Sequence, residues 1–155
     1  MDNLKTWGIH YISNREVHPN DAVMFDIDDT LIFTNGHPNK PIIELLNVAM
    51  QMGYRIVLIT ARPGLEYSIQ WTIGQLKEYK IRYNYLGFTS AETKHIMKKR
   101  LRYHFILSVG DLPTDLTASE HALNISNFVH SWDNSQIRSL VHQRTSSAFD
   151  SMSSY

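Results

Sequence analysis

Residues 22–30 read Ala22-Val23-Met24-Phe25-Asp26-Ile27-Asp28-Asp29-Thr30. A short apolar run that stops abruptly at acidic side chains is typical of a buried strand followed by a polar strand end. We therefore predict a strand over 22–27. The acidic group at its end is the first candidate for a functional site, because ligands of open α/β sheets bind where strands end.

The pattern of strand and helix repeats along the chain. Helical spacing, with Pro41 in the first turn and Gly53 after the last, predicts a helix over about 41–52. We predict further strands at 55–59, 83–88, 105–109 and 125–129, and further helices at 65–79, 90–101 and 114–122. In the helix over 65–79, Ile69, Ile73 and Leu76 are expected to form the buried face.

Strands that alternate with helices favour a parallel sheet, because right-handed connections place the helices on both of its faces. We predict an α/β fold, a three-layer α/β/α sandwich around a parallel sheet of about five strands. The predicted organisation is a lead-in at 1–20 of unassigned conformation, one domain at 21–142, and a Ser-rich tail at 143–155.

Composition limits the classes of function. The 155 residues are 43% apolar, which suffices for one packed core, and 15 basic residues balance 15 acidic ones. No overall positive field therefore draws the chain to nucleic acid or to anionic membranes. The absence of cysteine excludes thiolate chemistry and fits a reducing compartment. With no signal-peptide pattern and no membrane segment, we expect a cytoplasmic or otherwise intracellular protein.

Reactive groups follow other predicted strands as well. Thr60-Ala61-Arg62 follows the second strand, Gly110-Asp111-Leu112-Pro113-Thr114-Asp115 follows the fourth, and Lys94 lies near the start of a helix. Carboxylates gathered at one edge repel one another unless a cation offsets their charge. Hard oxygen ligands select Mg²⁺. A carboxylate beside Mg²⁺ and a lysine can attack phosphorus, which suggests phosphoryl transfer through an aspartyl-phosphate.

Taken in order, the Asp26-x-Asp28-x-Thr30 motif, Thr60, Lys94 and the Gly110-Asp111-x-x-x-Asp115 motif resemble the haloacid dehalogenase (HAD) superfamily over roughly 21–128. The resemblance implies a HAD-like Rossmannoid core. The segments between the motifs are short and already filled by predicted helices and strands, so we expect no large cap domain. The second Asp of the first motif favours a phosphatase over a dehalogenase, since displacing chloride needs no leaving-group acid.

The resemblance also implies a role for each matching residue. Asp26 would be the nucleophile, and Asp28 would protonate the leaving oxygen and then activate water. Thr60 and Lys94 would contact the phosphoryl group. Mg²⁺ would be held by the carboxylates of Asp26 and Asp111 and by the backbone carbonyl of Asp28, with Asp115 binding through water or holding the other ligands. Ala61 and Arg62 are further substrate-binding candidates, and Arg62 could equally pair with a carboxylate.

The substrate is left open by two finer resemblances. Thr60-Ala61-Arg62 with Trp71-Thr72 is similar to the acid phosphatase subclass, whereas Val23-Met24-Phe25-Asp26-Ile27-Asp28 is similar to the phosphatase domain of phage-type polynucleotide kinase. The first predicts a hydrolase of small phosphomonoesters and the second a polynucleotide 3′-phosphatase. A non-catalytic phosphate-binding or scaffold protein of the same fold is the third hypothesis.

The partners expected from these hypotheses follow from the absence of a cap. An uncapped site admits a phosphorylated macromolecule end, nucleic acid included, or a small ester if an oligomer closes it. The basic run Lys98-Lys99-Arg100-Arg102 is interpreted as a solvated helix face, with contact to nucleic-acid phosphates as the alternative. Trp71, Tyr79, Tyr83 and Tyr85 are interpreted as packing residues.

Overall fold

A computed structural model describes residues 1–126 of the chain. In chain order its elements are α1 (Asp2–Ile12), β1 (Asp21–Phe25), α2 (Lys40–Gln51), β2 (Arg55–Thr60), α3 (Glu66–Glu78), β3 (Tyr85–Phe88), the 3-10 helix η1 (Ala91–Thr93), α4 (Lys94–Leu101), β4 (His104–Gly110), α5 (Pro113–Leu116) and β5 (His121–Asn124). Strands and helices alternate as the sequence predicts.

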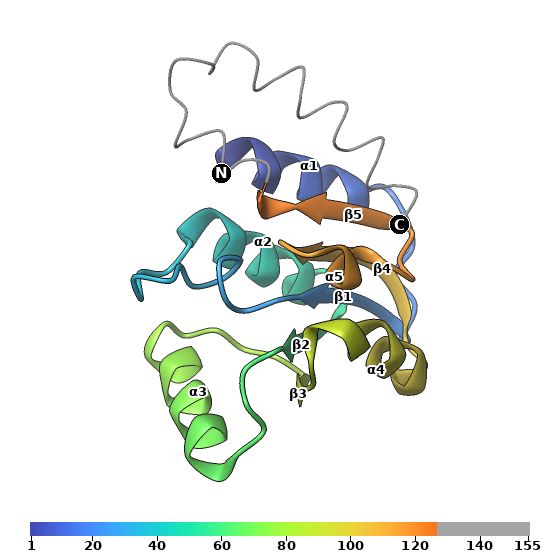
Figure 1. The fold of residues 1–155 in the computed structure, drawn as a ribbon. Helices are drawn as coiled ribbons and strands as arrows, with labels where there is room; N and C mark the ends of the chain where they lie inside the picture. Colours follow the sequence, from blue (N-terminus) through green and yellow to red (C-terminus); the bar gives the residue numbers. More distant parts are fainter. Residues whose placement is uncertain (127–155) are drawn as a thin grey trace.

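The five strands form one parallel sheet in the order β3-β2-β1-β4-β5, with β1 at the centre (Figure 1). The chain adds strands on one side of β1 and then returns to place β4 on the other side. A crevice is expected where the direction of winding reverses, at the carboxyl ends of β1 and β4. The predicted α/β sandwich with a parallel sheet is thus confirmed.

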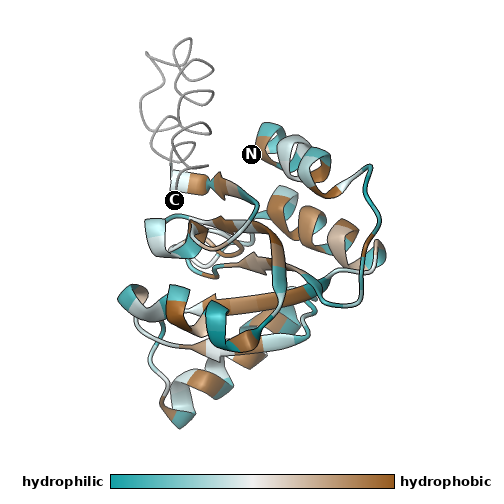
Figure 2. Ribbon diagram, turned by 90° about the vertical axis from the view of Figure 1, so that its right-hand side faces the viewer, coloured by the Kyte–Doolittle hydropathy of each residue, from teal (hydrophilic) through white to brown (hydrophobic). Residues whose placement is uncertain are grey.

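Apolar side chains of the central strands point alternately to the two faces of the sheet. Val23 and Phe25 join the larger core, to which α1, α2 and α3 also contribute side chains. Ala22 and Met24 join a smaller core on the other face, against which Met97 of α4 packs. Figure 2 shows the resulting pattern, with hydrophobic strands inside and hydrophilic stretches on the helices. Helices on both faces make the three layers.

The helix predicted over 41–52 is confirmed almost residue for residue. Its first turn contains Pro41, where the missing backbone N–H is not needed. Gly53 follows the helix with φ of +101°, a left-handed conformation that glycine adopts without steric cost. Among the described residues, the connections between successive strands from β1 to β4 contain only loops and the helices α2, α3, η1 and α4, with no inserted cap domain.

The N-terminal segment, left unassigned by the sequence analysis, contains helix α1. Leu4, Gly8 and Ile12 are buried along one side of it. At Gly8 an added Cβ would stand 2.8 Å from Leu45 of α2 and 3.1 Å from Leu123 of β5, so the missing side chain lets α1 lie close to both elements. The division of the chain at 20 and 142 stays a prediction, and the tail at 143–155 lies outside the described residues.

In α3 the predicted buried face is right for Leu76 and wrong for Ile69 and Ile73. Ser68, Thr72 and Leu76 are buried, whereas Ile69 and Ile73 are only half-buried. The hydroxyl of Thr72 accepts a hydrogen bond from Nη1 of Arg62 at 3.1 Å. A polar contact thus stabilises the inward position of a residue that a search for apolar periodicity does not select.

The two predicted elements after β4 are also displaced. Helix α5 ends at Leu116, six residues before the predicted end, and β5 occupies 121–124 in place of 125–129. Backbone carbonyls at this point bind a side chain: those of Asp115 in α5 and of Thr117 just after it accept hydrogen bonds from Nζ of Lys98. Carbonyls that bind a buried ammonium cannot continue the helix. Residues 127–129 of the predicted strand lie outside the described part.

None of the helices within residues 1–126 has both the length and the apolar character that crossing a bilayer requires.

Candidate active site

The candidate site lies where three neighbouring strands end. Asp26 directly follows β1, Thr60 is the last residue of β2, and Asp111 directly follows β4. Because these strands are parallel and adjacent in the sheet, their carboxyl ends meet at one edge (Figure 1). The backbone N–H of Asp26 donates to the carbonyl of Val109 at 2.9 Å, which fixes the end of β1 against β4.

Lys94 connects two carboxylates at this edge. Its Nζ lies 2.7 Å from Oδ1 of Asp26 and 2.7 Å from Oδ1 of Asp115. The side chain comes from the first residue of α4 and is 1% exposed, while Asp26 is 5% exposed. Removal of Lys94 from this arrangement would leave two buried carboxylates without compensation, whereas removal of the Asp26 charge would leave Lys94 paired with Asp115.

Asp111 completes a group of three carboxylates that fits a divalent cation. One oxygen from each of Asp26, Asp111 and Asp115 lies within 4.8 Å of the others. Oδ1 of Asp111 is enclosed and has no hydrogen-bond partner within the described part of the chain. Three ionised carboxylates around one ammonium leave a formal charge of −2, which Mg²⁺ would cancel with the oxygen ligands it prefers.

The electrostatics of the cluster show the same excess of negative charge. Burial raises the pKa of Asp26 well above its usual range, the charge of Asp115 raises it further, and Lys94 only partly offsets them. Burial also raises the pKa of Asp115 against the opposing effect of Lys94. The pKa of Lys94 is raised, because the two carboxylates outweigh the effect of burial. A bound cation would lower the pKa of Asp26 and favour its ionised form.

Both carboxylate oxygens of Asp115 are bound. Oδ1 contacts Lys94, and Oδ2 accepts hydrogen bonds from the backbone N–H of Asp111 at 3.2 Å and of Leu112 at 3.0 Å. Its packing requires glycine at position 110, where an added Cβ would stand 2.5 Å from Oδ2 of Asp115. These contacts suit a residue that orders the loop of Asp111 and the ammonium of Lys94.

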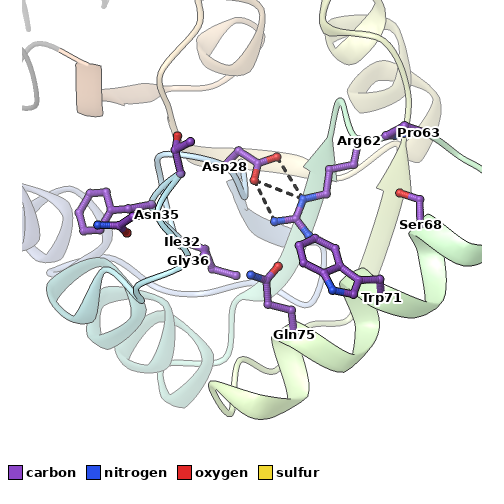
Figure 3. A pocket seen from close by; sticks show the side chains of 11 residues that line it. Asp28, Ile32, Asn35, Gly36, Arg62, Pro63, Ser68, Trp71 and Gln75 are labelled. Atoms are coloured by element: carbon purple, nitrogen blue, oxygen red, sulfur yellow. Dashed lines mark hydrogen bonds and ion pairs between the residues drawn. The ribbon is translucent and has the colours of Figure 1, made fainter.

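Asp28 lies apart from this cluster and is paired with Arg62 (Figure 3). Nη2 of Arg62 donates to Oδ1 at 2.8 Å, and Nε donates to Oδ2 at 3.1 Å. The guanidinium also donates to Thr72 and lies 5.0 Å from the ring centre of Trp71. Of the two interpretations of Arg62, the structure therefore shows the pairing with a carboxylate.

The remaining predicted residues lie beside the cluster. Thr60 is fully buried, and its Oγ1 accepts a hydrogen bond from the backbone N–H of Arg62 at 3.1 Å. That bond shapes the loop that begins at the exposed Ala61. The structure joins Lys94 to Asp26 and Asp115, places Asp111 beside these two carboxylates, and places Asp28 and Arg62 in a neighbouring ion pair.

Two sequence interpretations are wrong near the site. In the basic run, Lys99, Arg100 and Arg102 are exposed as predicted, but Lys98 is 1% exposed and does not belong to a solvated face. Its Nζ donates to Oγ of Ser108 at 2.7 Å and of Ser119 at 2.9 Å, so it stabilises the chain that follows Asp115. Its spacing of four residues from Lys94 was the available signal, because both then project from one face of α4. Trp71, interpreted as a packing residue, is 62% exposed.

A cavity of about 340 Å³ opens beside Asp28. Its walls come from the loop that follows β1, from α3 with Trp71 and Gln75, and from the loop that follows β2 with Arg62 (Figure 3). Sequence reasoning missed this cavity, because the residues of its walls are far apart in the chain.

Comparisons with known proteins identify similar chains. A family model described as haloacid dehalogenase-like hydrolase matches residues 23–106, more than half of the chain. No curated protein matches the sequence.

Two solved structures share the fold. A chain of the Pnkp1/Rnl/Hen1 complex is 22% identical with a TM-score of 0.53, over 68% of this chain and 44% of that one. A chain of the Pnkp1/Rnl/Hen1 RNA repair complex is 22% identical with a TM-score of 0.54, over 68% of this chain and 40% of that one. The present chain thus spans less than half the length of either match.

Proposed function

The chain belongs to the haloacid dehalogenase-like hydrolase family, and we propose that it hydrolyses phosphomonoesters with Mg²⁺ as cofactor and Asp26 as nucleophile. The observation that carries the proposal is the buried contact of Lys94 with Asp26 and Asp115 at the carboxyl edge of the sheet. A carboxylate beside an ammonium, with a further cation site at Asp111, can receive a dianionic phosphoryl group without prohibitive repulsion.

In the first proposed step, a carboxylate oxygen of Asp26 attacks phosphorus. The new bond joins that oxygen to phosphorus, and the bond from phosphorus to the ester oxygen breaks. The leaving oxygen takes a proton from Asp28, which must first be protonated and turn away from Arg62. Lys94 and the hydroxyl of Thr60 contact the phosphoryl oxygens. These contacts hold the phosphoryl group in line with the attacking oxygen of Asp26.

In the second step, water attacks the phosphorus of the aspartyl-phosphate. Asp28 accepts a proton from that water, the bond from phosphorus to Asp26 breaks, and inorganic phosphate leaves. The carboxylate of Asp28, which lies beside Arg62, would be the acceptor of this proton.

The metal would be held by Asp26, Asp111 and the backbone carbonyl of Asp28, with Asp115 ordering these ligands. When bound there, Mg²⁺ would supply positive charge that offsets the carboxylates and the phosphoryl oxygens. Asp111 contributes the enclosed oxygen that lacks a partner in the described part of the chain.

The test is phosphate release from p-nitrophenyl phosphate, nucleotides, a 3′-phosphorylated oligonucleotide and a phosphopeptide, with and without Mg²⁺. We expect Mg²⁺-dependent release that Asp26→Asn reduces to background while the variant remains folded by circular dichroism. Full activity in the folded variant would overturn the nucleophile assignment. An undiminished rate in EDTA would remove the metal from the mechanism.

A second candidate function is removal of a 3′-phosphate from a nucleic-acid end. It is favoured by the fold shared with a chain of an RNA repair complex. A strong preference for the 3′-phosphorylated oligonucleotide over p-nitrophenyl phosphate would select it. No phosphate release from any of these substrates would favour the third hypothesis, a phosphate-binding or scaffold protein.

A further inference from the structure

We propose that the cavity beside Asp28 is a subsite for the nucleobase of a nucleoside leaving group. This inference rests on the proposed function and adds a substrate class to it. In the proposed reaction Asp28 protonates the leaving oxygen, so the leaving group must lie on the side of Asp28. The cavity opens at that side chain and has a volume of about 340 Å³, within the usual range of small-molecule sites.

One wall of the cavity presents an aromatic surface. Trp71 is 62% exposed although it lines the cavity. Its indole packs on the guanidinium of Arg62, whose side chain is only 9% exposed and is itself held by Asp28 and Thr72. A large flat side chain that is fixed in advance binds a planar base with little loss of entropy.

A hydrogen-bonding group lies beside this aromatic surface. Oε1 of Gln75 is enclosed and has no hydrogen-bond partner among residues 1–126. Figure 3 shows the Gln75 amide directed into the same space that Trp71 borders. An enclosed acceptor without a partner costs free energy unless a ligand supplies a donor. The amino or imino edge of a nucleobase is such a donor.

The opposite wall is tied to the first. The hydroxyl of Tyr79, at the end of α3, donates to the carbonyl of Gly36 in the loop after β1. Within that loop, Oδ1 of Asp29 accepts hydrogen bonds from the backbone N–H of Thr34 at 3.0 Å and from its hydroxyl at 2.8 Å. The cavity is therefore formed before a ligand binds.

A leaving group without a base would leave these features unused. Glycerol or a plain sugar presents no planar face to Trp71, so the rates on such esters measure the phosphoryl site alone. The ratio of kcat/KM for a nucleotide to kcat/KM for glycerol phosphate isolates the contribution of the cavity. Any effect of a substitution on Asp28 through Arg62 changes both substrates and cancels in the ratio.

The experiment measures this ratio for adenosine 3′-monophosphate, adenosine 5′-monophosphate and a 3′-phosphorylated oligonucleotide. We expect the wild type to prefer nucleotides, and Trp71→Ala to lower the ratio by about 10-fold or more, chiefly through KM. Trp71→Phe retains a flat ring and should restore most of it. Tyr67→Ala is the matched control, because Tyr67 is 71% exposed on the same helix and does not line the cavity.

Direct binding separates this inference from the proposed function. Calorimetric titration of Asp26→Asn with adenosine monophosphate should show binding that Trp71→Ala weakens by a similar factor. Phosphate release without nucleotide preference would overturn the subsite and leave the phosphatase intact. Nucleotide binding without any phosphate release would overturn the proposed phosphatase and leave the subsite intact. The free nucleotides and the oligonucleotide show whether the base comes from a small molecule or from a nucleic-acid end.

Discussion

The ammonium of Lys94 lies 2.7 Å from Oδ1 of Asp26, and neither side chain is more than 6% exposed. The contact joins the start of α4 to the end of β1 across the carboxyl edge of the sheet. It serves two purposes in the proposed mechanism, because it offsets the charge of the nucleophile and would meet the charge of an incoming phosphoryl group. Loss of the ammonium should therefore affect stability and turnover together.

Lys94→Met should destabilise the protein more than Asp26→Asn does. Loss of the ammonium leaves buried carboxylates without compensation, which costs about 3–5 kcal/mol. Asp26→Asn instead removes one negative charge from a cluster that has an excess of them, so we expect no loss of stability in EDTA. Urea unfolding of both variants measures the difference. Equal destabilisation of the two variants would show that the cluster carries no excess of negative charge. Both variants should also lose phosphate release.

Mg²⁺ should raise the melting temperature of the wild type. A ligand at 100 times its Kd stabilises the folded state by about 2.7 kcal/mol. Asp111→Asn should lose most of this gain, because it removes a charge from the site and weakens an oxygen ligand. Glu78→Gln, an exposed carboxylate at the end of α3, is the matched control and should keep the gain. Thermal scans in Mg²⁺ and in EDTA give the comparison, and an equal shift in Asp111→Asn would place the cation elsewhere.

The cluster could be predicted from the sequence because the topology of a parallel sheet places the residues that follow its strands at one edge. Parallel strands bring Asp26, Thr60 and Asp111 to one edge whatever the details of the loops, and a lysine at a helix start can reach them. Local order along the chain was therefore enough to select Asp26, Lys94, Asp111 and Asp115 as a group.

The neighbouring features depend on contacts that local patterns do not contain. The pair of Asp28 with Arg62 joins residues 34 positions apart, and Arg62 in turn determines which side of α3 faces inward. Lys98 belongs to a run of basic residues, which usually indicates solvent, yet four oxygen acceptors from β4 and the following turn enclose its ammonium. Only the assembled fold supplies those acceptors.

Asp21 should make stability depend on pH in the acid range. Burial alone would raise the pKa of Asp21, but bonds from the backbone N–H of His18 and from Arg15 and His104 outweigh it and hold the pKa below its usual range. Since the folded pKa is lower than the unfolded one, the contribution is full above about pH 4 and is lost as pH falls below that.

Asp21→Asn removes this contribution. We expect the variant to be less stable at pH 7 by about 1.5 kcal/mol, the scale of hydrogen bonds to charged groups. The difference from the wild type should shrink as pH falls from 4 toward 2. Urea unfolding at several pH values measures it, and a difference that stayed constant down to pH 2 would rule out an ionised Asp21 as its source.

Gly110→Ala should disrupt the site through steric contact alone. Gly110 lies outside the left-handed region, so alanine costs nothing in backbone conformation, but its Cβ would stand 2.7 Å from Cγ of Asp115. Overpacking of this kind costs about 1–3 kcal/mol. Because Asp115 holds both Lys94 and the loop of Asp111, its displacement should lower kcat by about 10-fold or more.

Gly74→Ala in α3 is the matched control: nothing lies within 4 Å of the added Cβ, and alanine should stabilise the helix by about 0.5–1 kcal/mol. Steady-state kinetics and urea unfolding of the two variants give both quantities. If Gly110→Ala kept wild-type stability and kcat, the close packing of Asp115 would have no part in ordering the site.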